Sequence, residues 1–144
     1  MPRVQRSALL PYRAADVFAI VNDIGRYPEF LPWCSAAAVL SASEEEVLAE
    51  LSLSASGIRE TFTTRNRLVP FERIEMALVS GPFRRLSGGW TFTRLGNDQG
   101  CRVALELDFQ LAGMQSLLGG VFNRAADQMV DAFSARAEHL LGSA

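Results

Sequence analysis

The central part of the chain alternates apolar and polar residues with a period of two, from about residue 37 to residue 111. The alternation is cleanest at its end, where Val103, Leu105, Leu107 and Phe109 stand between polar or small residues. A period of two is typical of β-strands that bury one face. Short turn signals interrupt the alternation at Ser56-Gly57, Pro70-Phe71, Gly81-Pro82 and Gly96-Asn97-Asp98. Because these turns leave no room for crossover helices, the pattern predicts an antiparallel meander.

The N-terminal part predicts one strand and two short helices. Residues 4–12 alternate like a strand, which Pro11 brings to an end. Residues 13–22 carry apolar side chains at helical spacing. The following segment, 23–34, contains two prolines and a glycine, which forbid a long element and predict a short helix followed by a turn.

The C-terminal part follows a third pattern, in which apolar residues recur in steps of three, one and four from residue 114 to residue 141. This spacing predicts one continuous amphipathic helix of 28 residues. At 1.5 Å per residue such a helix is about 42 Å long. Gly119-Gly120 lies inside it and marks either a bend or a place where backbones pack closely.

Together these elements predict one α+β domain over residues 1–144. Its sheet has about seven antiparallel strands and curves, two short helices follow the first strand, and the long C-terminal helix packs on the concave face. A single helix about 10 Å across cannot fill a broad concave face alone. Either bulky side chains fill the remaining space or an apolar cavity is left. The apolar pattern fits both alternatives.

The charge balance argues against a general nucleic-acid binder. The net charge is −2, from 14 basic and 16 acidic residues, so we expect no DNA partner. Net charge does not describe distribution, however, and every basic residue is an arginine. Arg59, Arg65 and Arg67 share the strand face opposite Phe62, together with Thr63. This face is either simply solvated or a contact for ribosomal RNA, since arginine pairs well with phosphate.

Cysteine and histidine usage argues against a metal site and against catalysis. Cys34 and Cys101 have no CxxC spacing, and His139 is the single histidine, whereas a structural zinc site needs about four ligands. With no acid/base pair in view, we expect no metal, no cofactor and no enzyme activity. Two isolated cysteines without a signal peptide indicate reduced thiols in a cytoplasmic protein. No run of about 18 apolar residues is present, so we expect no transmembrane segment and at most transient membrane contact.

Several blocks of the sequence carry a resemblance to a known family. The segment Tyr27-Pro28-Glu29-Phe30-Leu31-Pro32-Trp33-Cys34 resembles the Tyr-Pro-x-Phe-Leu-Pro-x-Cys motif of the coenzyme Q-binding protein family, which includes the ribosome association toxin RatA proteins. Further blocks follow in the same order at residues 61–66, 81–86, 88–92, 105–109, 129–133 and 136–137. The resemblance covers nearly the whole chain, from Pro2 to about Leu141. That family belongs to the START-like, helix-grip superfamily, often called polyketide cyclase/dehydrase.

The resemblance implies a helix-grip fold and a hydrophobic ligand such as ubiquinone, bound without catalysis in support of cellular respiration. Its alternative implication is a toxin that binds the large ribosomal subunit and blocks subunit joining, with Arg59, Arg65 and Arg67 as the contact. For the ligand, Asn66 would donate a hydrogen bond to a quinone carbonyl, unless it reaches solvent at the strand end. The expected ligand-binding residues face inward from strands and the last helix: Trp33, Phe62, Asn66, Met76, Phe83, Trp90, Phe92, Phe109, Leu117, Val121, Phe122, Ala125 and Met129.

Overall fold

The computed structural model describes residues 3–55, 57–112 and 116–142, and the side chains of these residues except 116–118. Seven strands and three α-helices follow one another along the chain, with a short 3₁₀ helix, η1, after α1. Their bounds are β1 Arg3–Leu10, α1 Ala14–Asn22, η1 Ile24–Glu29, β2 Cys34–Ala42, β3 Glu46–Ala55, β4 Ile58–Val69, β5 Arg73–Ser80, β6 Phe83–Leu95, β7 Gly100–Leu111, α2 Ser116–Asp127 and α3 Met129–Leu141.

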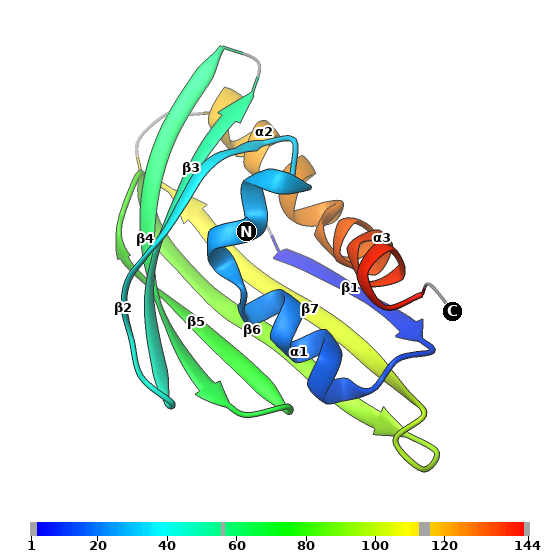
Figure 1. The fold of residues 1–144 in the computed structure, drawn as a ribbon. Coiled ribbons are helices and arrows are strands. Elements are labelled where there is room, and N and C mark those ends of the chain that lie inside the picture. The colour runs from blue at the N-terminus through cyan, green and yellow to red at the C-terminus, as the bar shows by residue number, and fades with distance from the viewer. Residues whose placement is uncertain (1–2, 56, 113–115, 143–144) are drawn as a thin grey trace.

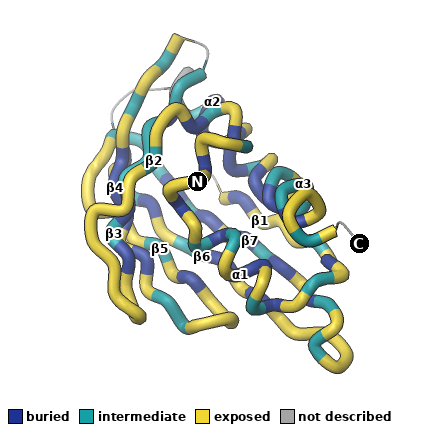
Figure 2. Tube along the Cα trace, viewed as in Figure 1, coloured by how far each residue is buried: buried dark blue, intermediate teal, exposed yellow. Residues whose placement is uncertain are grey.

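The strands form one antiparallel sheet in the order β1-β7-β6-β5-β4-β3-β2. The sheet curls, and the helices all lie on its inner side (Figure 1). Figure 2 shows that the buried residues lie on the strand and helix faces that point toward each other. The predicted α+β fold is therefore confirmed, with its seven-stranded sheet, two short helices after the first strand and C-terminal helices on the concave face.

The prediction of one continuous C-terminal helix is wrong, because Gln128 separates α2 from α3. Its backbone has φ −95° and ψ −2°, away from the values of a regular α-helix. Hydrogen bonds continue on both sides, from the Gln128 amide to the Arg124 carbonyl and from the Ala132 amide to the Gln128 carbonyl. The interruption thus lies at a residue that carries no helix-breaking signal, and not at Gly119-Gly120. The first residues of the predicted helix, 114 and 115, lie outside the described residues.

The pairing of β4 with β5 contains an irregularity. Thr63 lies opposite Ser80 and Thr64 lies opposite Leu78, so Val79 of β5 is the extra residue of a bulge. The pairing of β4 with β3 has no such shift, and Phe62, Thr64 and Asn66 therefore all lie on the buried side, as their alternation predicts. Thr63 is buried as well, although alternation places it on the opposite face with Arg65.

Two adjacent glycines bring the central strands close together. A Cβ atom at Gly88 would lie 2.0 Å from the carbonyl oxygen of Glu106 on β7, and one at Gly89 would lie 2.1 Å from that of Ile74 on β5. Gly88 also has φ +140°, which side-chain-bearing residues rarely adopt. Only glycine therefore fits here, immediately before Trp90, whose side chain projects onto the concave face.

Aromatic rings fill much of the space between sheet and helices. On α2, the ring of Phe122 meets those of Phe62, Phe83 and Phe109 edge-on, with centroids 6.0, 4.9 and 4.6 Å apart. A second group forms around Phe133 of α3, whose ring lies 5.2, 5.1 and 5.1 Å from those of Tyr27, Phe30 and Trp90. Edge-on packing of this kind adds to the stabilisation from burial alone.

Candidate functional site

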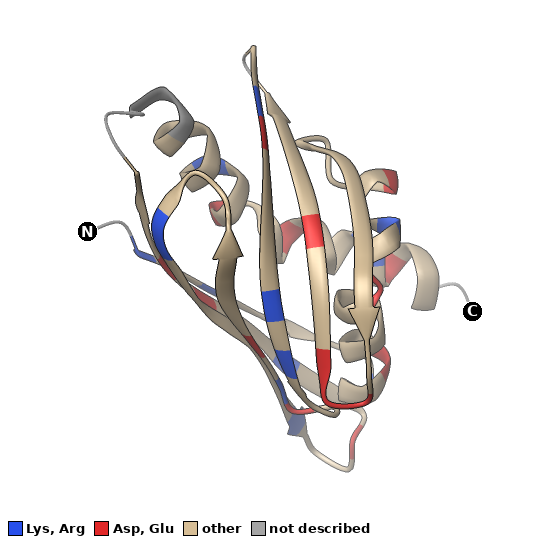
Figure 3. Cartoon of the chain, turned by 90° about the vertical axis from the view of Figure 1, so that its left-hand side faces the viewer, with Lys and Arg blue, Asp and Glu red and all other residues tan. Residues whose placement is uncertain are grey.

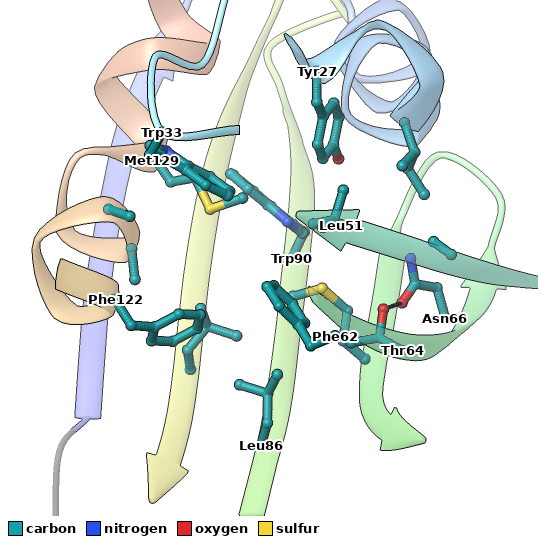
Figure 4. Close-up of a pocket in the computed structure, with 16 residues that line it drawn as sticks. Tyr27, Trp33, Leu51, Phe62, Thr64, Asn66, Leu86, Trp90, Phe122 and Met129 are labelled. Atoms are coloured by element: carbon teal, nitrogen blue, oxygen red, sulfur yellow. Dashed lines mark hydrogen bonds between the residues drawn. The ribbon is translucent and has the colours of Figure 1, made fainter. Parts of the chain in front are cut away.

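An apolar cavity of about 50 Å³ lies between the concave face of the sheet and the C-terminal helices (Figure 4). Members of both aromatic groups line it. Its wall also includes η1, the chain before β2, and the inward faces of β3 to β7. The lining residues are Ile24, Tyr27, Trp33, Ala49, Leu51, Phe62, Thr64, Asn66, Met76, Leu86, Trp90, Leu107, Phe122, Ala125, Ala126 and Met129.

Short side chains at facing positions explain why space remains here. Ala49 on β3 lies opposite Thr64 of β4, and both are buried. Across the cavity, α2 presents Ala125 and Ala126, which are also buried. Methyl groups on both walls leave a gap that the large rings at either end do not fill. The two flexible thioether side chains at the cavity, Met76 and Met129, can adapt their shape to an occupant.

Two buried residues at the cavity, Asn66 and Trp90, carry side-chain N–H groups that donate no hydrogen bond within the described part of the chain. Asn66, 5% exposed, uses its Oδ1 atom to accept a hydrogen bond of 2.9 Å from the Thr64 hydroxyl, and its amide nitrogen donates none. Trp90 is 1% exposed, and its indole nitrogen likewise donates no hydrogen bond to any of the described residues. Figure 4 shows the Asn66 nitrogen directed away from Thr64 and the Trp90 nitrogen directed toward the middle of the lining residues. Polar groups of buried residues are normally paired, so these two donors at a cavity indicate a place where a hydrogen-bond acceptor would be accommodated.

Tyr27 contributes its ring to the cavity wall, but its hydroxyl proton is not available to a ligand. Its hydroxyl donates a hydrogen bond to the backbone carbonyl of Val21. Burial, and to a lesser degree the neighbouring Cys34 and Asp23, raise the pKa of Tyr27 well above its ordinary value. The hydroxyl therefore stays protonated at neutral pH and does not serve as a general base.

Both cysteines are buried free thiols, and neither lines the cavity. Burial raises the pKa of Cys34 to about 11, partly offset by a backbone interaction at Ala36 that lowers it. Burial, followed by the Asp98 carboxylate, also raises the pKa of Cys101. Because the thiolate is the nucleophilic form, Cys34 is unreactive at neutral pH.

The cavity wall is electrically neutral. None of the lining residues in the described part of the chain is ionised at neutral pH. His139 lies exposed in the last turn of α3 and is not among them. The site thus offers apolar surface and hydrogen-bond donors, which suit binding, and its described lining residues include no charged acid/base pair.

Eight of the predicted ligand-binding residues line the cavity, and their role in binding remains a prediction. They are Trp33, Phe62, Asn66, Met76, Trp90, Phe122, Ala125 and Met129.

Four others do not line the cavity. Phe83 and Phe109 pack against the Phe122 ring, and Phe92 packs between Trp90 and Phe18, so their surfaces are covered by other aromatic rings. Val121 is buried but is also absent from the wall. The side chain of Leu117 lies outside the described residues.

The remaining lining residues were not among the predicted contacts. They are Ile24, Tyr27, Ala49, Leu51, Thr64, Leu86, Leu107 and Ala126. Strand alternation places Leu51 and Leu107 on the inner face, and Tyr27 belongs to the first family-like block. No sequence signal marks Ala49, because a small side chain is equally common in a packed core and in a cavity wall.

The outer face of the sheet carries Arg59, Arg65 and Arg67, all of them exposed. Arg65 forms an ion pair of 3.0 Å with Glu46, and Arg67 lies opposite Glu46 on β3 and Glu75 on β5. Figure 3 shows acidic and basic residues side by side over these strands. This face is therefore of mixed charge, and its contact with a ribosome remains a prediction.

Within the described residues, no helix combines the length and the apolar composition needed to cross a membrane.

Comparison with known proteins places the chain among related sequences. The family described as polyketide cyclase / dehydrase and lipid transport matches residues 10–134. A protein of Pseudomonas aeruginosa named ribosome association toxin RatA is 51% identical over 141 residues, which cover 96% of this chain and 97% of that protein. The mitochondrial coenzyme Q-binding protein COQ10 homolog B of Xenopus laevis is 26% identical over 94% of this chain and 58% of its own length.

Solved structures share the fold at low sequence identity. The protein TTHA0849 of Thermus thermophilus superposes with a TM-score of 0.84 at 17% identity, over 97% of this chain and 99% of its own. The aromatase/cyclase Zhui of Streptomyces sp. R1128 also reaches 0.84, at 18% identity, over 96% and 94%. At these identities the likeness concerns the fold alone.

Proposed function

The chain belongs to the polyketide cyclase/dehydrase and lipid transport family, in the branch that includes the RatA proteins, and on this premise we propose that it binds a hydrophobic, lipid-like ligand without catalysing a reaction. The observation that carries the proposal is the neutral, apolar cavity between sheet and helices. Ubiquinone is the ligand we propose, in a role that supports cellular respiration. The coenzyme Q-binding name of the Xenopus laevis relative supports this choice.

The ligand must enlarge the cavity when it binds. A cavity of about 150 Å³ is known to hold benzene, and the present one measures about 50 Å³. Met76 and Met129 are unbranched and can turn aside, and Trp33 is only half-buried at the cavity. Each buried methylene of a lipid tail contributes about 0.8 kcal/mol, which offsets the rearrangement of these side chains.

A non-enzymatic role is supported by the chemistry of the wall. Acid/base catalysis needs a group that exchanges a proton near neutral pH. The cavity offers a tyrosine with a raised pKa and no ionised side chain among its described residues. The aromatase/cyclase with the same fold is 18% identical, too distant for its activity to be carried over.

The decisive experiment fills the cavity from the helix side. Protein purified gently is extracted with organic solvent and analysed by mass spectrometry, and thermal stability is measured with and without a short-chain ubiquinone. We expect Ala125→Leu to lose both the extracted lipid and the stabilisation, because Ala125 lines the cavity. Ala135→Leu is the matched control, since Ala135 is exposed on α3. Unchanged loading of Ala125→Leu, or no lipid and no stabilisation in the parent protein, contradicts the proposal.

A second function, association with the large ribosomal subunit, is supported by the name of the 51% identical relative. It does not compete with ligand binding, because the cavity lies on the concave side of the sheet and Arg59, Arg65 and Arg67 lie on the other. Its first test is co-sedimentation of the purified protein with isolated large subunits at low salt. Absence of the protein from the ribosomal pellet contradicts it.

A further inference from the structure

Two unpaired donors in a neutral cavity indicate what kind of head group the site selects. The Asn66 amide and the Trp90 indole each present an N–H without an acceptor in the described part of the chain. Burying an N–H without a partner costs free energy that an acceptor on a ligand would recover. A plain hydrocarbon leaves both donors unpaired, whereas a ligand with a carbonyl oxygen does not.

The strand register places the two donors around one point of the sheet. Asn66 of β4 lies opposite Met76 of β5, and Trp90 of β6 lies opposite Ile74 of the same strand. Neighbouring strands are about 4.8 Å apart, so β4 and β6 are separated by about 10 Å across β5. Both side chains project from the concave face, and Met76 lies between them. A head group resting on Met76 would therefore have a donor on each side.

The same wall disfavours a charged head group. A carboxylate buried here would have no cation beside it, because none of the described lining residues is an arginine or histidine. Transferring an unpaired charge from water into such a site is far more costly than transferring a neutral oxygen. The Asn66 oxygen is moreover already an acceptor for the Thr64 hydroxyl, which orients the amide with its N–H groups free.

We infer that the cavity selects uncharged lipids with a carbonyl-type acceptor oxygen, and that Asn66 and Trp90 are the specificity-determining residues. Ketones, quinones and esters belong to this class, and free fatty acids and plain hydrocarbons do not. The inference rests on the proposed lipid-binding function and adds the chemistry of the head group to it.

The test compares four probes of equal chain length by displacement of a fluorescent apolar dye at pH 8: a methyl ketone, the corresponding alkane, the fatty acid and its methyl ester. We expect the ketone to bind about tenfold tighter than the alkane, the gain of a buried hydrogen bond that is otherwise unmade. The fatty acid should bind more weakly than its own methyl ester. Equal affinities for ketone and alkane, or a preference for the fatty acid, overturn the inference.

Variants assign the preference to the two donors. Asn66→Leu and Trp90→Phe remove one N–H group each and should lower the ratio of ketone to alkane affinity toward one. Gln5→Leu is the matched control, since it removes an exposed side-chain amide outside the cavity wall and should keep the ratio. Because the ratio is measured within one variant, a general change in cavity size or stability cancels. An unchanged ratio in both donor variants contradicts the assignment.

The outcomes separate this inference from the function on which it rests. If the alkane and the ketone bind equally well, the result supports lipid binding and contradicts selection of the head group. If none of the probes displaces the dye and none raises thermal stability, the proposed function itself fails, and the inference with it.

Discussion

Gly89 shows how a single missing side chain allows neighbouring strands to approach closely. A Cβ at this position would lie 2.1 Å from the Ile74 carbonyl oxygen and 3.1 Å from the Cα atom of Glu75, both on β5. Since these are backbone atoms of a paired strand, they cannot move away as a flexible side chain could. We expect Gly89→Ala to lower the free energy of unfolding by about 3 kcal/mol or more, the upper range for overpacking, measured by urea denaturation.

Gly120 provides the opposite case within the same chain. It is exposed on α2, and a Cβ there meets nothing within 4 Å. Gly120→Ala should therefore raise the free energy of unfolding by up to about 1 kcal/mol, the difference in helix propensity. If both substitutions shift the urea midpoint in the same direction, the close approach at Gly89 is not what makes glycine necessary.

The thiol of Cys34 should react only under alkaline conditions. Burial raises its pKa to about 11, and the thiolate forms only as the pH approaches that value. At pH 8 roughly one molecule in a thousand then carries the thiolate, against about a quarter for an ordinary cysteine. Alkylation by iodoacetamide, followed by mass spectrometry, should accelerate about tenfold per pH unit between pH 8 and pH 10.

The same pKa has a consequence for stability, and its sign follows from proton binding. Between the ordinary cysteine pKa, about 8.5, and the folded value, the native state holds a proton that the unfolded state has lost. The contribution of Cys34 to stability is therefore complete below pH 8.5 and is lost as the pH rises toward 11.

The control for the alkylation experiment is the protein unfolded in urea at the same pH. Equal alkylation rates of the folded and unfolded protein at pH 8 would show that the fold does not protect Cys34.

At the scale of elements, Phe122 connects α2 to the sheet. Its ring lies edge-on to three rings from β4, β6 and β7, and it also lines the cavity. Phe122→Ala should lower the free energy of unfolding by about 3–5 kcal/mol, as expected when a large core side chain is truncated. Phe71→Ala is the control, because Phe71 is 54% exposed and meets only the Phe18 ring among the described aromatic side chains. A similar destabilisation of both variants would contradict the anchoring of α2 by Phe122.

The strands could be predicted from the sequence because a strand that buries one face alternates apolar and polar residues. Along β7, Val103, Leu105, Leu107 and Phe109 are all buried, as their alternation predicts. The register shift between β4 and β5 could not be predicted, since its extra residue, Val79, is a valine like those found in regular strands. The helix interruption at Gln128 likewise has no signal in the sequence, because the residues on both sides continue the helical hydrogen bonds.

The cavity wall was predictable only in part, for a geometric reason. Alternation shows that Phe62 and Phe109 both point inward, but not how far the opposing helix stands from each. The Phe122 ring lies 4.6 Å from that of Phe109 and 6.0 Å from that of Phe62. Phe62 lines the cavity and Phe109 does not. Which inward side chain meets a cavity depends on the size of residues on another element, and therefore on the assembled structure.

At the scale of the whole molecule, the two proposed functions use opposite surfaces of the sheet and should differ in their dependence on salt. The proposed ligand site on the concave side has no charged wall residue among those described, so we expect ligand binding to be insensitive to ionic strength. Ribosome association through Arg59, Arg65 and Arg67 would release counterions from RNA, and affinity would fall steeply with salt. Replacing all three arginines with glutamine should weaken co-sedimentation and reduce the slope of log affinity against log salt, by about 0.7 to 0.9 for each phosphate that the protein no longer neutralises.

The control for this prediction keeps the net charge equal. Arg26, Arg94 and Arg102 are exposed on other parts of the molecule, and their replacement with glutamine removes the same three charges. If association depends on the face that carries Arg59, Arg65 and Arg67, the control variant should keep the parental slope, because counterion release is local to the contact. Ubiquinone binding should survive in both variants. Equal weakening of ribosome binding by the two variants would mean that net charge, and not this face of the sheet, governs the association.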